Sequence, residues 1–168
     1  MLRRLLVVLA IVGLLFALSL RPAGAAAATQ TTSPVVAMAG GAVVGSSTLT
    51  RTASGLSFTL ETSGLEPGHA ITIWWMVVNP DGSLSVLYAA GHVVDQSGTA
   101  EFGGSLQEGD TAGAIVGPGL LDAANADVYL VVRDHGPAKP DILNDQIHTF
   151  DVCNPTCTDL RISVHLAS

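Results

Sequence analysis

Two cysteines, Cys153 and Cys157, carry the most defined chemistry in this chain. In an oxidising compartment such a pair forms a disulfide, and Asn154-Pro155 between them supplies the turn. The closed loop is short, so chain entropy adds only about 2 kcal/mol, and we expect the bond mainly to hold the bend between the last two strands. The alternative is a metal-binding or redox dithiol. However, the chain lacks the βαβ pattern of the thioredoxin-like folds that use C-x3-C for copper delivery.

Histidines raise the question of a transition-metal site. The candidates are His69, His92, His135, His148 and His165. No two of them lie within twelve residues of each other, so there is no H-x-H pair like that of copper–zinc superoxide dismutase. The Cys, His and Met run of a blue-copper site is also missing. We expect His69 and His135, which lie beside turns, to be exposed structural residues.

Acidic residues in predicted turns raise the question of calcium. The candidates are Asp81, Asp95, Glu108, Asp110, Asp122 and Asp127. Their spacing does not match the dense D-x-D-x-D-G pattern of a calcium loop, and Asp in turns mainly bonds nearby backbone groups. The chain also has no G-x-S-x-G nucleophile elbow. We therefore expect no catalytic residue, no enzyme activity and no cofactor, with calcium or copper/zinc binding as the alternative.

Two adjacent tryptophans, Trp74 and Trp75, lie in a run that is predicted to be a strand. Neighbouring side chains on a strand point to opposite faces, so one indole should lie in the core and the other on the outer face. The outer ring is either covered by another segment or exposed as a platform for a sugar or a partner protein.

A long connection from Asp134 to Asp145 follows a strongly apolar run. Loops of this length usually bind something or are disordered, and two prolines favour an ordered one. Arg133, His135 and Lys139 are among the few cationic or titratable nitrogen groups of the chain. We predict that these three residues form a contact surface together with Trp74 and Trp75. A plain crossover between sheets is the alternative.

The first twenty-eight residues have the pattern of a secretory signal peptide: Arg3 and Arg4, an apolar run, and small residues up to Ala28. An uncleaved anchor is the alternative, but the apolar run from Leu5 to Leu20 is short of the roughly 20 residues of a spanning helix. We expect a signal peptide over residues 1–28, a flexible leader over 29–33 and a single domain over 34–168. The cleaved product would be secreted, either extracellular or periplasmic.

Without the signal segment the chain keeps four Lys and Arg residues against fourteen Asp and Glu residues, a net charge of −10. Such an acidic surface disfavours nucleic acids, whose phosphates need clustered cations, and anionic membrane surfaces. A partner protein, a neutral glycan or a cation is compatible with this charge.

Short apolar runs separated by turn residues dominate the rest of the sequence. The strand-like runs, from which we expect about eight or nine strands, are 35–44 and 46–52, which supply the first strand or two, and then 56–62, 69–78, 84–88, 91–95, 99–102, 111–116, 128–133, 146–152 and 160–166. Asn79-Pro80-Asp81-Gly82 is the strongest turn signal among them. Eight or nine strands at this spacing predict an all-β fold, an antiparallel Greek-key, immunoglobulin-like β-sandwich.

Several segments resemble a group of secreted bacterial proteins that have no assigned activity. They are Ser63–Trp75, Asn79–Gly82, Gly91–Gly98, Leu106–Asp110, Leu130–Pro137 and Gln146–Phe150. The resemblance covers nearly all of the chain after the signal, and implies a fold and a location but no activity. Members of that group carry extra cysteines in the loop after the tryptophan strand, whereas this chain has the short Asn79–Ser83. A looser likeness to chordin-type and anti-sigma-factor extracellular modules concerns turns and strands alone.

The function expected from these observations is that of a non-enzymatic, secreted or cell-surface protein. It would act by binding a partner protein or neutral glycan, or as a component of an extracellular matrix.

Overall fold

The computed structural model describes residues 28–167, so the predicted signal peptide lies outside the described residues apart from Ala28. The described chain is all-β except for one four-residue helix, α2 (Leu143–Gln146). The strands are β1 (Thr29–Ala37), β2 (Val43–Arg51), β3 (Gly55–Ser63), β4 (His69–Val78), β5 (Leu84–Val93), β6 (Thr99–Gln107), β7 (Ala114–Val116), β8 (Asp127–Pro137) and β9 (Thr158–His165). Within residues 28–167, no helix is long and apolar enough to cross a membrane.

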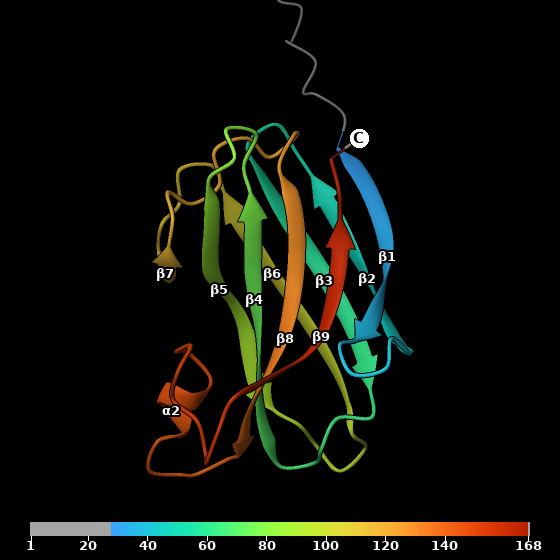
Figure 1. Ribbon diagram of the computed structural model, residues 1–168, viewed down its shortest axis with the longest axis vertical. Coiled ribbons are helices and arrows are strands. Elements are labelled where there is room, and N and C mark those ends of the chain that lie inside the picture. Colours follow the sequence, from blue (N-terminus) through green and yellow to red (C-terminus); the bar gives the residue numbers. More distant parts are fainter. Residues whose placement is uncertain (1–27, 168) are drawn as a thin grey trace, which may run out of the picture.

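All nine strands belong to one antiparallel sheet in the order β6-β3-β2-β1-β9-β8-β4-β5-β7. The sheet curls into a half-barrel, so that β5, β4, β8 and β9 lie in front of β6 and β3 (Figure 1). β1 pairs with β2 along its whole length, but with β9 at just two positions, Val36 with Ile162 and Ala37 with Arg161. The all-β prediction is confirmed. A Greek-key sandwich of two separate sheets is not, because this narrow seam joins the two halves.

The core lies inside the curl, between the β6-β3-β2-β1 half and the β9-β8-β4-β5-β7 half. In β3, Leu56, Phe58 and Leu60 are buried while the residues between them are exposed, as the alternating sequence predicts. β4 supplies Ile73 and Trp75 to the same hydrophobic cluster. Because β4 is apolar on both sides, its outward side chains also need a cover.

Several segments differ from the sequence prediction, among them residues 38–42, which separate β1 from β2 instead of continuing a predicted strand over residues 35–44. Thr29 to Ser33, predicted to be a flexible leader, belong to β1 and pair with Arg51 to Ser47 of β2. Residues 91–95, predicted to be a separate strand, mostly continue β5, which runs without interruption to Val93. The backbone hydrogen-bonding groups of these residues are thus used by neighbouring strands that the local pattern does not reveal.

The predicted strand over residues 146–152 is wrong, and β8 continues four residues beyond its predicted end. Gln146 shows why. Its buried side-chain amide donates to the carbonyl oxygens of His135 and Pro137, and its oxygen accepts from the Lys139 N–H. These bonds satisfy backbone groups at the end of β8 that another strand would otherwise have paired.

Candidate functional site

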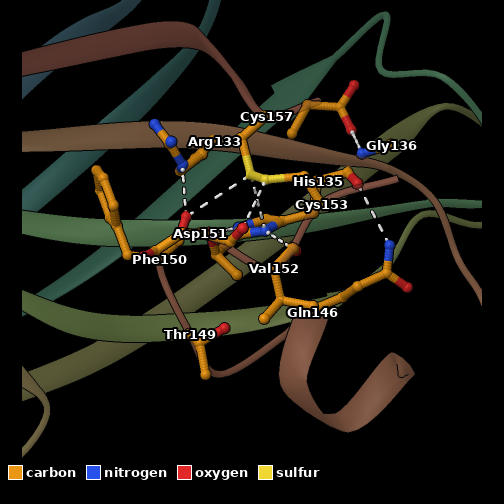
Figure 2. Close-up of a disulfide and its surroundings, with 12 residues drawn as sticks. Arg133, His135, Gly136, Gln146, Thr149, Phe150, Asp151, Val152, Cys153 and Cys157 are labelled. Carbon is orange, nitrogen blue, oxygen red and sulfur yellow. Dashed lines mark hydrogen bonds between the residues drawn. A yellow bond between two sulfur atoms is a disulfide. The ribbon is translucent and has the colours of Figure 1, made fainter. Parts of the chain in front are cut away.

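The disulfide lies in the segment that connects α2 to β9. Cys153 and Cys157 are bonded to each other with their Cα atoms 5.2 Å apart, which confirms the predicted pairing. Figure 2 shows the bond lying against the end of β8, beside the imidazole of His135. The disulfide therefore does more than close the short loop between the two cysteines. It also packs against β8, which ends more than fifteen residues earlier in the chain.

His135 is fully buried beside this disulfide, which corrects the prediction of an exposed loop residue. The residue lies within β8 rather than in a loop, and the segment after α2 passes over it. Its Nδ1 donates to the carbonyl oxygen of Val152 at 2.8 Å and lies 3.4 Å from Sγ of Cys157. Burial lowers the pKa of His135, because a charged imidazole would lose its hydration there.

A chain of hydrogen bonds connects this imidazole to one of the tryptophans. Nε1 of Trp74 donates to Oγ1 of Thr72 at 2.7 Å, and this hydroxyl donates to Nε2 of His135 at 2.8 Å. Because Nδ1 of His135 already donates to Val152, the chain requires the neutral imidazole with its proton on Nδ1. Every polar atom of the three side chains has a partner.

Both tryptophans are buried, so neither forms an exposed platform. Trp75 points into the core and packs edge-on against Phe58. Trp74 points to the outer face as alternation predicts, but Phe150 and Tyr88 cover it with ring centroids 5.0 and 5.7 Å away. Of the two readings left open by the sequence, the covered outer ring is correct.

The two cationic residues of the predicted contact surface are not alike. Arg133 lies over the ring of Phe150, donates to that residue's carbonyl oxygen and pairs with Asp159. Lys139 is exposed after the end of β8. The structure thus brings Arg133, His135 and Trp74 together, but as the underside of a covering segment. Of the five residues predicted to form the contact surface, Trp74, Trp75 and His135 are buried, Arg133 is half-buried and Lys139 is exposed.

Four of the six acidic calcium candidates are used within their own turns, whereas Glu108 and Asp127 accept from the distant backbone N–H groups of Ala123 and Ala167. Asp81 accepts from the backbone N–H and the hydroxyl of Ser83, and the side-chain bond lowers the pKa of Asp81. Asp95, Asp110 and Asp122 likewise bond backbone N–H groups two residues further on. These carboxylates do not converge on a common point in the described residues.

A second buried histidine lies at the seam where β1 separates from β9. Nε2 of His165 is 2.7 Å from Oγ of Ser47, its Nδ1 is 2.9 Å from Oγ1 of Thr31, and Ser47 is 2.6 Å from Oγ of Ser163. A serine against a histidine resembles a nucleophile with its base. However, Ser47, Ser163 and His165 are at most 2% exposed, so no substrate reaches them.

Sequence reasoning missed this seam cluster, although a signal existed. Ser47 in β2 and Ser163 and His165 in β9 occupy the inward positions of alternating strands. Polar residues at such positions indicate a buried network, because isolated polar groups in a core are costly.

The outer side of the β9-β8-β4-β5-β7 half carries an uninterrupted apolar row. It consists of the cross-strand neighbours Val164, Tyr129, Met76, Val86 and Val116. Leu84 and Val78 lie beside this row as a further cross-strand pair. We call these seven side chains the apolar face. Val116, Leu84 and Val164 are 50%, 43% and 36% exposed. Val78, Met76 and Tyr129 are half-buried, and Val86 is buried. The exposed apolar surface is therefore concentrated at the two ends of the row and at Leu84, and exposed apolar patches mark interaction sites in soluble proteins.

The opposite outer face, on β1, β2, β3 and β6, is rich in hydroxyl groups. We call it the hydroxyl face, and its outward residues include Thr32, Ser46, Thr48, Thr50, Ser57, Thr59, Glu61, Glu101 and Ser105. A shallow hollow of about 260 Å³ is lined by residues 44–46, 61–63 and 99, and a smaller one of about 100 Å³ adjoins it. Neither hollow contains an aromatic ring or a cation.

Comparisons with models of protein families, with curated proteins and with solved structures found no match to this chain.

Proposed function

We propose that this chain is a secreted or cell-surface protein without catalytic activity, which binds a partner protein through its apolar face. The observation that carries the proposal is the row from Val164 to Val116, which crosses five strands without a charged residue and whose one hydroxyl belongs to Tyr129. Burying such a row against another protein is favourable by about 25 cal/mol for each Å² of apolar surface removed from water.

The charges around the apolar face indicate the chemistry of its partner. Asp127 is the cross-strand neighbour of Val78, and Asp81 lies in the turn before Leu84. Among the described cations, Arg51 and Arg161 are buried and Arg133 is paired with Asp159. The matching surface on the partner is therefore apolar at its centre and bordered by Lys or Arg.

A protein partner fits this face better than a neutral glycan does. Sugar binding was predicted from an exposed indole, and both indoles are buried. Secretion is supported by the pattern of residues 1–28 and by the disulfide, since such bonds persist in oxidising compartments.

The experiment uses a photo-cross-linking amino acid at two matched positions, Val116 on the apolar face and Thr48 on the hydroxyl face. Cells that produce the protein are irradiated, and adducts are identified by mass spectrometry. We expect one protein to be attached at position 116 and not at position 48. The purified partner should then bind at least tenfold more weakly to the Val116→Lys, Val164→Lys double variant than to Thr48→Lys.

Four results would overturn the proposal. They are the absence of adducts, equal adducts from both positions, adducts with a second copy of the chain, and glycan-array binding that the double variant abolishes. Turnover of a broad substrate panel that a single substitution abolishes would overturn its non-enzymatic part.

A further inference from the structure

Three metal-ligating side chains converge at the end of β8. A ring nitrogen of His135 and the Sγ atoms of Cys153 and Cys157 all lie within 4.8 Å of one another. Figure 2 shows the imidazole lying directly against the two sulfur atoms. It is the one such group among the residues that the structure describes. While the sulfur atoms are bonded to each other they carry no negative charge, so the oxidised cluster offers no thiolate ligand.

We propose that reduction of this disulfide creates a site for one Cu(I) ion, held by Sγ of Cys153, Sγ of Cys157 and Nδ1 of His135. Two thiolates with an imidazole form a soft ligand set of the kind that selects Cu(I) or Zn²⁺. Zn²⁺ takes four ligands in structural sites, and no further His, Cys, Asp or Glu of the described chain joins this group. Two soft thiolates and one imidazole complete a trigonal site for Cu(I).

The step balances with a dithiol as reductant. The dithiol becomes a disulfide, and its two electrons and two protons convert the bonded Cys153 and Cys157 into two thiols. Cu(I) then replaces both thiol protons, which pass to the solvent. His135 keeps one proton, which moves from Nδ1 to Nε2. The hydroxyl of Thr72, which donates to Nε2 in the oxidised protein, must then rotate its own proton away, so that Oγ1 accepts the Nε2 proton across the same 2.8 Å contact.

The loop between the cysteines is fastened to β8 independently of the disulfide. The backbone N–H of Asn154 donates to the carbonyl oxygen of His135 at 2.7 Å, and its side-chain amide donates to that of Pro137 at 3.1 Å. At Gly136 a Cβ atom would collide with the Asn154 carbonyl oxygen, so only glycine permits this close approach. The thiols therefore stay beside the imidazole after reduction.

The three proposed ligands differ in their exposure to solvent, and the more exposed ones are the two cysteines that must be reduced. Both cysteines are half-buried, so a reductant and a copper donor reach the sulfur atoms, whereas His135 is fully enclosed. The enclosed imidazole is held at its other nitrogen by Thr72, which is the arrangement that orients metal-bound histidines. The site lies near the end of β8, away from Tyr129 of the apolar face, so this inference and the proposed function can fail separately.

The test compares oxidised and dithiol-reduced protein under anaerobic conditions, with Cu(I) delivered from a chromophoric chelator. We expect one Cu(I) per chain in the reduced protein and none in the oxidised protein. Cys153→Ser should abolish binding. His135→Gln, which keeps hydrogen-bonding capacity but removes the imidazole, should weaken it at least tenfold, whereas the exposed His148→Gln should leave it unchanged. X-ray absorption should report two sulfur ligands and one nitrogen ligand.

Circular dichroism of the reduced protein and of each variant accompanies every titration. Reduced wild-type protein that unfolds or takes up no copper would overturn the proposal. Equal Cu(I) affinity in His135→Gln would also overturn it, because the dithiol alone would then be the site. If the reduced protein bound one Zn²⁺ per chain and no Cu(I), the assignment of the site to Cu(I) would be wrong.

Discussion

The two outer faces of the curled sheet have opposite chemistry. On the hydroxyl face, Thr48 and Thr59 are cross-strand neighbours that expose small polar groups to water. On the apolar face, Met76 and Tyr129 are cross-strand neighbours in a row that ends in Val116. The polar outer side of one half of the sheet is therefore compatible with contact with water. The other half carries a second, external layer of apolar side chains. We infer that the half with the external layer is the one that meets partners.

The chain itself covers part of this second layer. Phe150 lies edge-on against Trp74, and Arg133 lies 3.9 Å above the ring of Phe150. The cover comes from the segment between α2 and β9, at one end of the strands (Figure 1). Toward the other end, Val116 and Leu84 remain about half exposed. The outer side of this half is therefore covered by the chain itself at Trp74 and exposed to solvent at Val116 and Leu84.

The largest expected effect distinguishes the external layers of the two faces. Trp74→Ala removes the ring that packs on Tyr88 and Phe150, and should lower the free energy of unfolding by about 3–5 kcal/mol. Thr59→Ala on the hydroxyl face should change it by no more than about 0.5 kcal/mol. Urea unfolding of both variants measures the difference. Similar values for the two would refute the contrast between the faces.

A smaller effect is expected from removing the cover alone. Phe150 is half-buried, so Phe150→Ala should cost about 2 kcal/mol, less than a fully buried ring. It should also make Trp74 accessible, which acrylamide quenching of tryptophan fluorescence detects. Asp151→Ala, an exposed change in the same segment, serves as the control. Unchanged quenching in Phe150→Ala would mean that the segment does not shield the indole.

The smallest effect concerns the seam between the two halves. Burial and the charge of Arg51 lower the pKa of His165 below its ordinary value of 6.5. The unfolded chain therefore binds more protons than the folded chain once the pH falls below about 6.5, and stability decreases. The melting temperature should fall between pH 7.5 and pH 5.5, and His165→Gln should reduce this fall whereas the exposed His148→Gln should not. An equal fall in all three proteins would exclude His165 as a cause.

Much of the local structure could be predicted from the sequence, and the errors have a common origin. β4 agrees with its predicted range because a dense apolar run between two turn clusters leaves few alternatives. The sequence pattern predicts a strand at Gln146 because it does not show that the side chain of this residue bonds the carbonyl oxygens of β8. The sequence pattern predicts a leader at Thr29 because the pairing of this residue with Arg51 depends on a strand more than ten residues away.

The sequence by itself determined the all-β class, the opposite directions of Trp74 and Trp75, and the pairing of Cys153 with Cys157. Each of these follows from a period of two residues or from a short separation, both of which are local properties of the chain. Only the tertiary structure decided that His135 lies against the disulfide and that Phe150 covers the outward ring of Trp74. Those outcomes depend on which distant segments pack together, and that choice is the sum of many weak contacts over the whole chain.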